Sequence, residues 1–149
     1  MMKIKRLDVD AVLPSRAHNT DAGLDVYSLE DVHIPYYTDA VIKTGFAMSL
    51  PDGWVAIVKE KSGRATKNKL TIGACVIDSS YRGEVLIHLF NNGRGDVEIK
   101  AGEAIAQLVI VPCWTGQPIE VEDLGETERG EGKFGSTGLK RKLDTRQNG

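Results

Sequence analysis

Cysteine is scarce in this sequence, which has 149 residues and only two cysteines, Cys75 and Cys113. Two cysteines cannot build the disulfide framework of a small secreted domain, and a chain of this length can bury a core without one. We expect both to be free thiols, as is usual in the cytoplasm, with a single disulfide between them as the alternative.

Long apolar runs and an excess of one charge are also missing. No segment is long enough to span a membrane, and residues 1–6 lead into no signal-type apolar stretch, so we expect a cytoplasmic protein without membrane contact. The 19 basic and 21 acidic residues give a formal charge of -2, which argues against general nucleic-acid binding. A few cations gathered in a cleft for a small polyanion are compatible with that charge.

Helical periodicity is the third absence, since only the short stretch 64–69 is a candidate helix. Turn residues separate the strand-like segments, and Pro51-Asp52-Gly53 predicts a hairpin between two of them. Many short strands predict an all-β fold, a jelly-roll-like sandwich or barrel with one short helix. The segments with β-branched and apolar strand patterns are 40–43, 46–50, 54–58, 85–90 and 105–111.

The end of the chain differs in composition from the rest. From Gly125 onward the sequence is polar and rich in glycine, with one aromatic residue, and it ends in a charged tail. We predict a jelly-roll core over residues 1–124 and a glycine-rich C-terminal arm with its tail over 125–149. Composition alone favours a frayed terminus for this arm.

Two segments of the predicted core carry groups suited to nucleotide chemistry. Lys61-Ser62-Gly63-Arg64 places cations, a hydroxyl and backbone N–H groups at a turn, which suits phosphate oxygens. Asp78 lies between an apolar pair and Tyr81, where a carboxylate can orient and deprotonate a water. Each has a plainer interpretation, because Ser-Gly turns are common and an isolated aspartate most often bonds its own loop.

The arm holds a third such segment. Arg129 offers a bidentate fork for a phosphate, Phe134 a ring for a base, and the run 135–138 a series of backbone and hydroxyl donors. Together these groups suit a ligand that has both a triphosphate and a base. The arm is therefore predicted to belong to a nucleotide site.

Five segments, in order along the chain, resemble the five motifs of the trimeric deoxyuridine triphosphate nucleotidohydrolase (dUTPase) family. The resemblance covers about residues 20–138. It implies a jelly-roll homotrimer that hydrolyses dUTP to dUMP and pyrophosphate, which keeps uracil out of DNA and supplies dUMP for thymidylate synthesis. The matching segments are Asp21-Ala22-Gly23-Leu24-Asp25-Val26-Tyr27, Lys61-Ser62-Gly63, and the stretches 75–83, 102–108 and 129–138.

The resemblance also implies roles for single residues, at sites shared between subunits. Asp78 would activate the water that attacks the α-phosphorus, and Tyr81 would pack against the deoxyribose and exclude a ribose. The other implied substrate contacts are Cys75, Val76, Ile77 and Leu86 for uracil, Lys61, Ser62, Gly63 and Gln107 for the phosphates or water, and, in the arm, Arg129 for the γ-phosphate, Phe134 for stacking on uracil, and Gly135 and Ser136 for closure over the phosphates.

The cofactor implied by the resemblance is Mg²⁺. It would sit on the triphosphate oxygens with its other positions filled largely by water, so no protein metal site is expected. The three histidines, His18, His33 and His88, show no ligand spacing and are expected to be structural or solvent-facing.

Several positions depart from the family pattern. Lys61 stands in place of an arginine, Glu60 of a proline, Cys75 of a glycine, Ser80 of an aspartate and Lys133 of a glycine. Lysine keeps the charge of arginine but loses its bidentate fork. A side chain at position 75 could crowd the base, although its cost is small if that residue has a negative φ.

Three other functions compete with this interpretation. A dCTP deaminase shares the expected fold but explains the arm less well. A regulator that uses dUTP binding as a switch, with an unknown protein partner, is separated from an enzyme by a turnover assay. A jelly-roll binding module with a disordered tail leaves the five motifs unexplained.

Overall fold

The computed structural model describes residues 1–133, and the predicted site residues Phe134, Gly135 and Ser136 lie outside this range. The chain divides into two units, Met1–Thr115 and Gly116–Gly149. Every strand that the structure describes lies in the first unit, and the last of them ends at Pro112. The predicted boundary between a core over 1–124 and an arm over 125–149 stays a prediction.

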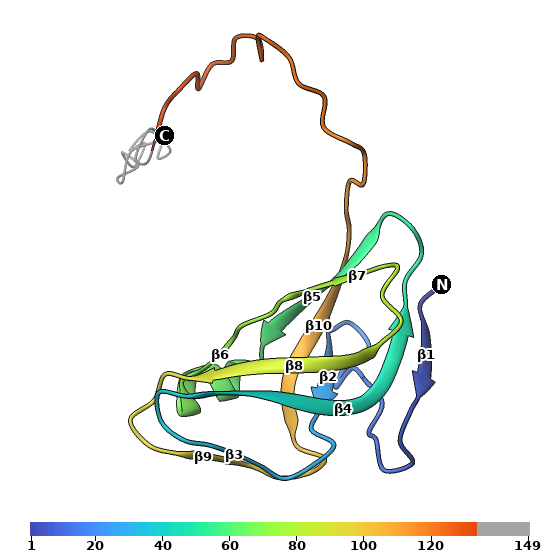
Figure 1. The fold of residues 1–149 in the computed structure, drawn as a ribbon, viewed down its shortest axis with the longest axis vertical. Coiled ribbons are helices and arrows are strands. Elements are labelled where there is room, and N and C mark those ends of the chain that lie inside the picture. Colours follow the sequence, from blue (N-terminus) through green and yellow to red (C-terminus); the bar gives the residue numbers. More distant parts are fainter. Residues whose placement is uncertain (134–149) are drawn as a thin grey trace, which may run out of the picture. The chain divides into compact units, whose positions relative to one another are not determined.

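Two four-stranded antiparallel sheets make up most of the first unit (Figure 1). This all-β architecture with one short helical turn confirms the predicted jelly-roll-like fold class. A third sheet has two strands, β3 (Val32–Ile34) and β9 (Val97–Ile99). The four-stranded sheets have the orders β1 (Lys3–Arg6), β4 (Asp39–Ser49), β8 (Glu84–Asn91), β6 (Leu70–Ile72) and β2 (Gly23–Tyr27), β10 (Ala104–Pro112), β5 (Trp54–Glu60), β7 (Val76–Asp78).

The core lies between the inner faces of the sheets. In β8, Val85, Ile87 and Leu89 are buried and the residues between them face outward, because successive side chains of a strand point to opposite faces. They pack in one cluster with Phe46 of β4 and Leu108 of β10. Removing one such large buried side chain typically costs about 2–5 kcal/mol, so this cluster fixes the positions of the strands that carry the site.

Strand β4 covers the predicted segment 40–43 and all but the last residue of 46–50, with a bulge between them. Its pairing with β8 breaks after Lys43↔Leu86 and resumes at Ala47↔Glu84. Gly45 lies in this bulge with a φ of 71°, and a Cβ there would lie 2.6 Å from the Cβ of Ala11. Glycine is therefore required at position 45 by both conformation and space.

The turn Pro51-Asp52-Gly53 does not form a hairpin, which corrects the prediction. It closes as a tight turn, with the Trp54 N–H donating to the Pro51 carbonyl at 3.3 Å. However, β4 pairs with β1 and β8, whereas β5 pairs with β10 and β7. The turn thus carries the chain from one sheet to the other, and the local alternation of residues is the same in both cases.

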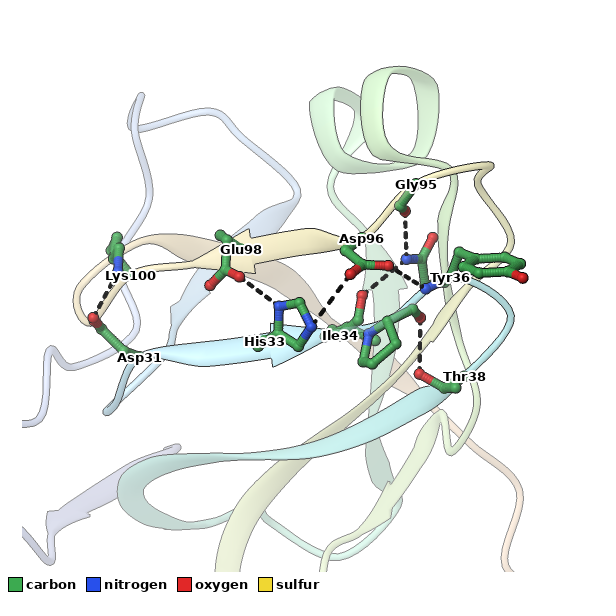
Figure 2. A network of polar contacts seen from close by, with 11 residues as sticks. Asp31, His33, Ile34, Tyr36, Thr38, Gly95, Asp96, Glu98 and Lys100 are labelled. Carbon is green, nitrogen blue, oxygen red and sulfur yellow. Dashed lines mark hydrogen bonds and ion pairs between the residues drawn. The ribbon is translucent and has the colours of Figure 1, made fainter.

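Polar and charged side chains link the two strands of the two-stranded sheet (Figure 2). His33 of β3 contacts Glu98 through Nδ1 and Asp96 through Nε2, the latter at 3.4 Å. Lys100 Nζ donates to Asp31 at 2.8 Å and lowers the pKa of that carboxyl. His33 is thus structural and solvent-facing, as predicted.

The cysteines are also as predicted. Cys75 is exposed, Cys113 is partly buried, and both are free thiols. Among the described residues, no helix has the length and apolar character needed to cross a membrane.

Candidate functional site

A hollow of about 180 Å³ lies where β7, the turn after it and the start of β8 meet. Five of the predicted site residues line it, and they carry the roles assigned to the water, the sugar and the base. The full lining is Val58, Ala74, Val76, Ile77, Asp78, Tyr81, Glu84, Val85 and Leu86. Residues from two different sheets therefore meet in one concave surface.

Asp78 is placed at this hollow by the end of β7. Its backbone pairs with Val55 of β5, and the Tyr81 N–H donates to its carbonyl at 3.1 Å, which closes the turn. Its carboxylate is exposed and makes none of the side-chain hydrogen bonds within residues 1–133, unlike Asp8, whose carboxylate accepts the Asp10 N–H. The exposed carboxylate can accept a proton from a water in the hollow.

Cys75, next to the hollow, fits its position without backbone strain. Within the described part of the chain, the only residues other than glycine with positive φ are Tyr37 and Lys69. The Cys75 carbonyl accepts the Val58 N–H at 2.7 Å and is engaged with β5. Cys75 therefore does not have the positive φ that would make a side chain costly at this position, so the replacement of the usual glycine causes no backbone strain.

Two of the phosphate-binding candidates, Lys61 and Gly63, line a separate hollow of about 250 Å³. The predicted helix at 64–69 is confirmed as a short π-helical turn, η1 (Arg64–Asn68), which follows exposed Ser62 and Gly63. Lys61 and Gly63 line this second hollow, which shares no lining residue with the first. Within one chain, the residues assigned to the base and those assigned to the phosphates are thus not brought together.

Lys61 is held by a carboxylate of the first motif. Its Nζ donates to both oxygens of Asp25 at 2.7 Å, and the Asp25 side chain is only 17% exposed. Arg64 is also engaged, with Glu103 at 3.0 Å and the Ala104 carbonyl at 3.2 Å. The Lys100 N–H and Arg64 hold the pKa of Glu103 below its ordinary value, so the ion pair with Arg64 persists to lower pH than it would with an unperturbed glutamate.

Gln107 lies on β10, the strand between β2 and β5, and its backbone pairs with Asp25, the partner of Lys61. Its Nε2 donates to the Glu60 carbonyl at 2.9 Å. A Cβ on Gly23 would lie 2.1 Å from its Oε1, so a larger residue at position 23 would require the end of the Gln107 side chain to move. Glu60, a departure from the family pattern, also accepts the Ile72 N–H at 3.3 Å and so ties β5 to β6.

Two residues that hold parts of the candidate site in place were not predicted from the sequence. Asp25 is the partner of Lys61, and Glu84 accepts two backbone N–H groups of β4. The only signal for the first was that Asp25 lies in the first motif, because β10 separates β2 from β5 and the contact with Lys61 depends on the sheet order. The second depends on the β4 bulge, which the sequence did not predict.

Arg129 is described within the second unit. Its Nε donates to the Gly132 carbonyl at 3.1 Å, and the Gly130 N–H donates to the Thr127 carbonyl at 3.0 Å. These bonds form a local turn that leaves the Arg129 side chain exposed.

The family model described as dUTPase matches residues 10–138. This chain belongs to the dUTPase family. Deoxyuridine 5'-triphosphate nucleotidohydrolases are similar along nearly all of it. The one from Clostridium acetobutylicum is 44% identical over 142 residues, which is 94% of this chain and 98% of that protein. The one from Arabidopsis thaliana is 43% identical over 137 residues, 92% of this chain and 82% of that protein.

Solved dUTPase structures have the same fold. A mutant dUTPase of Staphylococcus bacteriophage 80alpha with dUpNHpp is 35% identical, with a TM-score of 0.88, and the match covers 93% of this chain and 99% of that one. A mutant dUTPase of phage phi11, described with a structural Mg(II) ion, is 32% identical with a TM-score of 0.79 over 85% of this chain and 99% of that one.

The donor set in this dUTPase family member fits a metal carried by the substrate. Within residues 1–133, no three His, Cys, Asp or Glu side chains gather as metal ligands. The first hollow has two carboxylates in its lining, Asp78 and Glu84, and that of Glu84 is bonded to backbone N–H groups. Mg²⁺ bound by triphosphate oxygens and water is compatible with these residues.

Lys61→Ala is expected to lower kcat/KM for dUTP about 10- to 100-fold, because losing a hydrogen bond to a charged group costs about 1.5–3 kcal/mol. Lys61→Arg should keep most of the activity, since the positive charge beside Asp25 remains. Steady-state kinetics on dUTP measure both effects. Lys59→Ala is the matched control, because Lys59 is an adjacent exposed lysine paired with Glu60. Parental kinetics in Lys61→Ala would show that the phosphate contact is made elsewhere.

Proposed function

We propose that this chain hydrolyses dUTP to dUMP and pyrophosphate, with water attack at the α-phosphorus. The observation that carries the proposal is the first hollow, where the exposed Asp78 carboxylate lies beside Tyr81 and the backbone of Val76 and Ile77, in a member of the dUTPase family. The product dUMP would serve thymidylate synthesis, and removal of dUTP would keep uracil out of DNA.

In this proposal each residue acts by orientation, desolvation or proton transfer. Asp78 takes the proton of the attacking water, while Tyr81 packs on the deoxyribose. Backbone groups of residues 75–77 and of Leu86 select uracil, because a wrong base leaves a buried polar group unpaired. When bound, Mg²⁺ neutralises charge on the triphosphate.

Lys61, Ser62, Gly63 and Gln107 hold phosphate oxygens or position the water in the same scheme. Arg129 reaches the γ-phosphate, Phe134 stacks on uracil, and Gly135 and Ser136 close over the phosphates. The contacts of Lys61 with Asp25 and of Gln107 with Glu60 support fixed positions for Lys61 and Gln107. Preorganised groups of this kind need no rearrangement as charge develops in the reaction.

We also propose that the active protein is a homotrimer. Support comes from the separation of Lys61 and Gly63 from the Asp78 hollow within one chain, because a complete site then needs residues from more than one copy. Light scattering coupled to gel filtration should report a mass of about three times 16.3 kDa. A clean monomer that still hydrolyses dUTP would contradict shared sites.

The experiment that tests the proposed function is pyrophosphate release from dUTP, dCTP, dTTP and UTP, with and without Mg²⁺. We expect rapid release from dUTP with Mg²⁺ and little from the other three nucleotides. Ammonia release from dCTP would instead indicate a deaminase. Binding of dUTP without turnover would favour a regulatory switch.

The location and the partners of the protein form the last part of the proposal. Two free thiols favour the reducing cytoplasm, where we propose the protein acts. We propose no general nucleic-acid binding, in keeping with the formal charge of -2. A regulatory protein partner stays a prediction without a named candidate. Phage dUTPases, among them that of Staphylococcus bacteriophage 80alpha, are described as controlling the transfer of virulence genes by a G protein-like mechanism. That role is stated for the phage proteins and not for this chain.

A further inference from the structure

We propose that Glu84 is a positioning residue that sets selectivity for deoxyribose over ribose by fixing the ring of Tyr81. This inference rests on the proposed function and extends it to a residue with no assigned role. Glu84 connects the β4 bulge, through its carboxylate, to the Tyr81 hydroxyl, through its carbonyl.

The carboxylate of Glu84 satisfies donors that the bulge leaves without a strand partner. Its Oε1 accepts the Thr44 N–H at 3.2 Å and the Gly45 N–H at 2.8 Å. Regular pairing between β4 and β8 stops at Lys43 and resumes at Ala47, so the ladder does not supply these acceptors. Buried N–H groups must find acceptors, and this requirement anchors the side chain of Glu84 to β4.

The backbone of Glu84 in turn fixes Tyr81. The Tyr81 hydroxyl donates to the Glu84 carbonyl at 2.9 Å. The ring lies against Gly83, where a Cβ would be 2.4 Å from the hydroxyl oxygen and 2.6 Å from Cζ. The absence of a side chain at Gly83 therefore makes room for the Tyr81 ring, and the Glu84 carbonyl holds the hydroxyl end of that ring. The ring itself lines the hollow beside Asp78.

Selectivity against ribose depends on where this ring lies. A ring that excludes a 2′-hydroxyl must be held in a fixed position. A small displacement of the ring would make room for the additional oxygen atom of a ribose. Tyr81 is 44% exposed, so packing alone does not hold it. The chain from the β4 bulge through Glu84 to the Tyr81 hydroxyl supplies the missing restraint.

A purely structural role for Glu84 has a different signature. Loss of the bulge contacts would then lower stability and reduce the folded fraction, which scales the rates on dUTP and UTP equally. A positioning role changes the ratio of kcat/KM for dUTP to that for UTP. This ratio is independent of how much of the protein is folded.

The test compares Glu84→Ala, Glu84→Gln and Glu98→Ala with the parent, using pyrophosphate release from dUTP and UTP. We expect Glu84→Ala to lower the dUTP/UTP ratio about 10-fold, mainly through a lower KM for UTP and a higher KM for dUTP. Glu84→Gln should restore most of the ratio, because its amide oxygen can accept the same two N–H groups. Glu98→Ala, which removes an interstrand carboxylate contact with His33, should leave the ratio unchanged.

If Glu84→Ala does not fold, Tyr81→Phe replaces it, because this variant keeps the ring and removes only the bond to the Glu84 carbonyl. Its dUTP/UTP ratio should fall by a similar factor. A parental ratio in the folded variant would overturn the inference alone. A parent protein that releases no pyrophosphate from dUTP would overturn the proposed function, and the inference with it.

Discussion

Asp78→Asn is expected to lower kcat for dUTP by about 10² to 10⁴-fold, the usual cost of losing a general base. The amide can still orient a water in the hollow beside Tyr81, but it cannot take a proton at neutral pH. Because Asp78 is exposed and its side chain makes no hydrogen bond within the described residues, the thermal midpoint should change little. Single-turnover kinetics on dUTP measure the chemical step directly.

The control for this variant is Asp52→Asn, which changes an exposed aspartate in the turn between β4 and β5. It should have parental kcat. The mass by light scattering and the affinity for a non-hydrolysable dUTP analogue should be parental in both variants. A near-parental kcat in a correctly assembled Asp78→Asn protein would remove Asp78 from the role of base.

Truncation after Thr127 should also reduce turnover steeply while leaving the fold intact. It removes Arg129 and all residues outside the described range, but no strand, since β10 ends at Pro112. The thermal midpoint and the mass of the assembly should therefore be close to parental. Turnover should fall because the proposed arm excludes water and adds a cation to the triphosphate.

Two point variants separate the contributions within the arm. Arg129→Ala should reproduce much of the loss, mainly in kcat if the guanidinium acts in the transition state. Phe134→Ala should cost about 1–3 kcal/mol, the usual value of a base-aromatic stack. The control truncation after Leu139 keeps both residues and should have parental kinetics. A protein cut after Thr127 with parental kcat/KM would show that the arm is only a frayed end.

The strand pattern was predictable because each strand has one buried face. Residues 85–90 of β8 were predictable as a strand from their apolar and β-branched composition, but the run is almost continuously apolar, so the burial of Val85, Ile87 and Leu89 became known only from the structure. The partner of a strand is set by contacts far away in sequence, which is why Pro51-Asp52-Gly53 was wrongly predicted to be a hairpin. Both sheets use the same alternation, so local residues cannot tell them apart.

In the candidate site, too, local sequence patterns were predictable and contacts between distant residues were not. The motif order identified Asp78 and Tyr81, and the structure places both in one hollow. Lys61 follows β5, and its partner Asp25 lies on β2. The two residues come together only because β10 pairs with both strands and so holds β2 and β5 in one sheet. No spacing rule along the chain predicts such a contact.

The place of β10 in its sheet has a consequence for biosynthesis. Its residues 104–112 lie between β2 and β5, so these strands have no common partner until the ribosome has passed Pro112. The backbone N–H and C=O groups on the edges of β2 and β5 that face β10 stay unpaired during most of translation, and closing such long loops is slow. A nascent chain paused before residue 104 should therefore remain sensitive to protease and aggregation-prone, and it should become resistant abruptly once β10 is released.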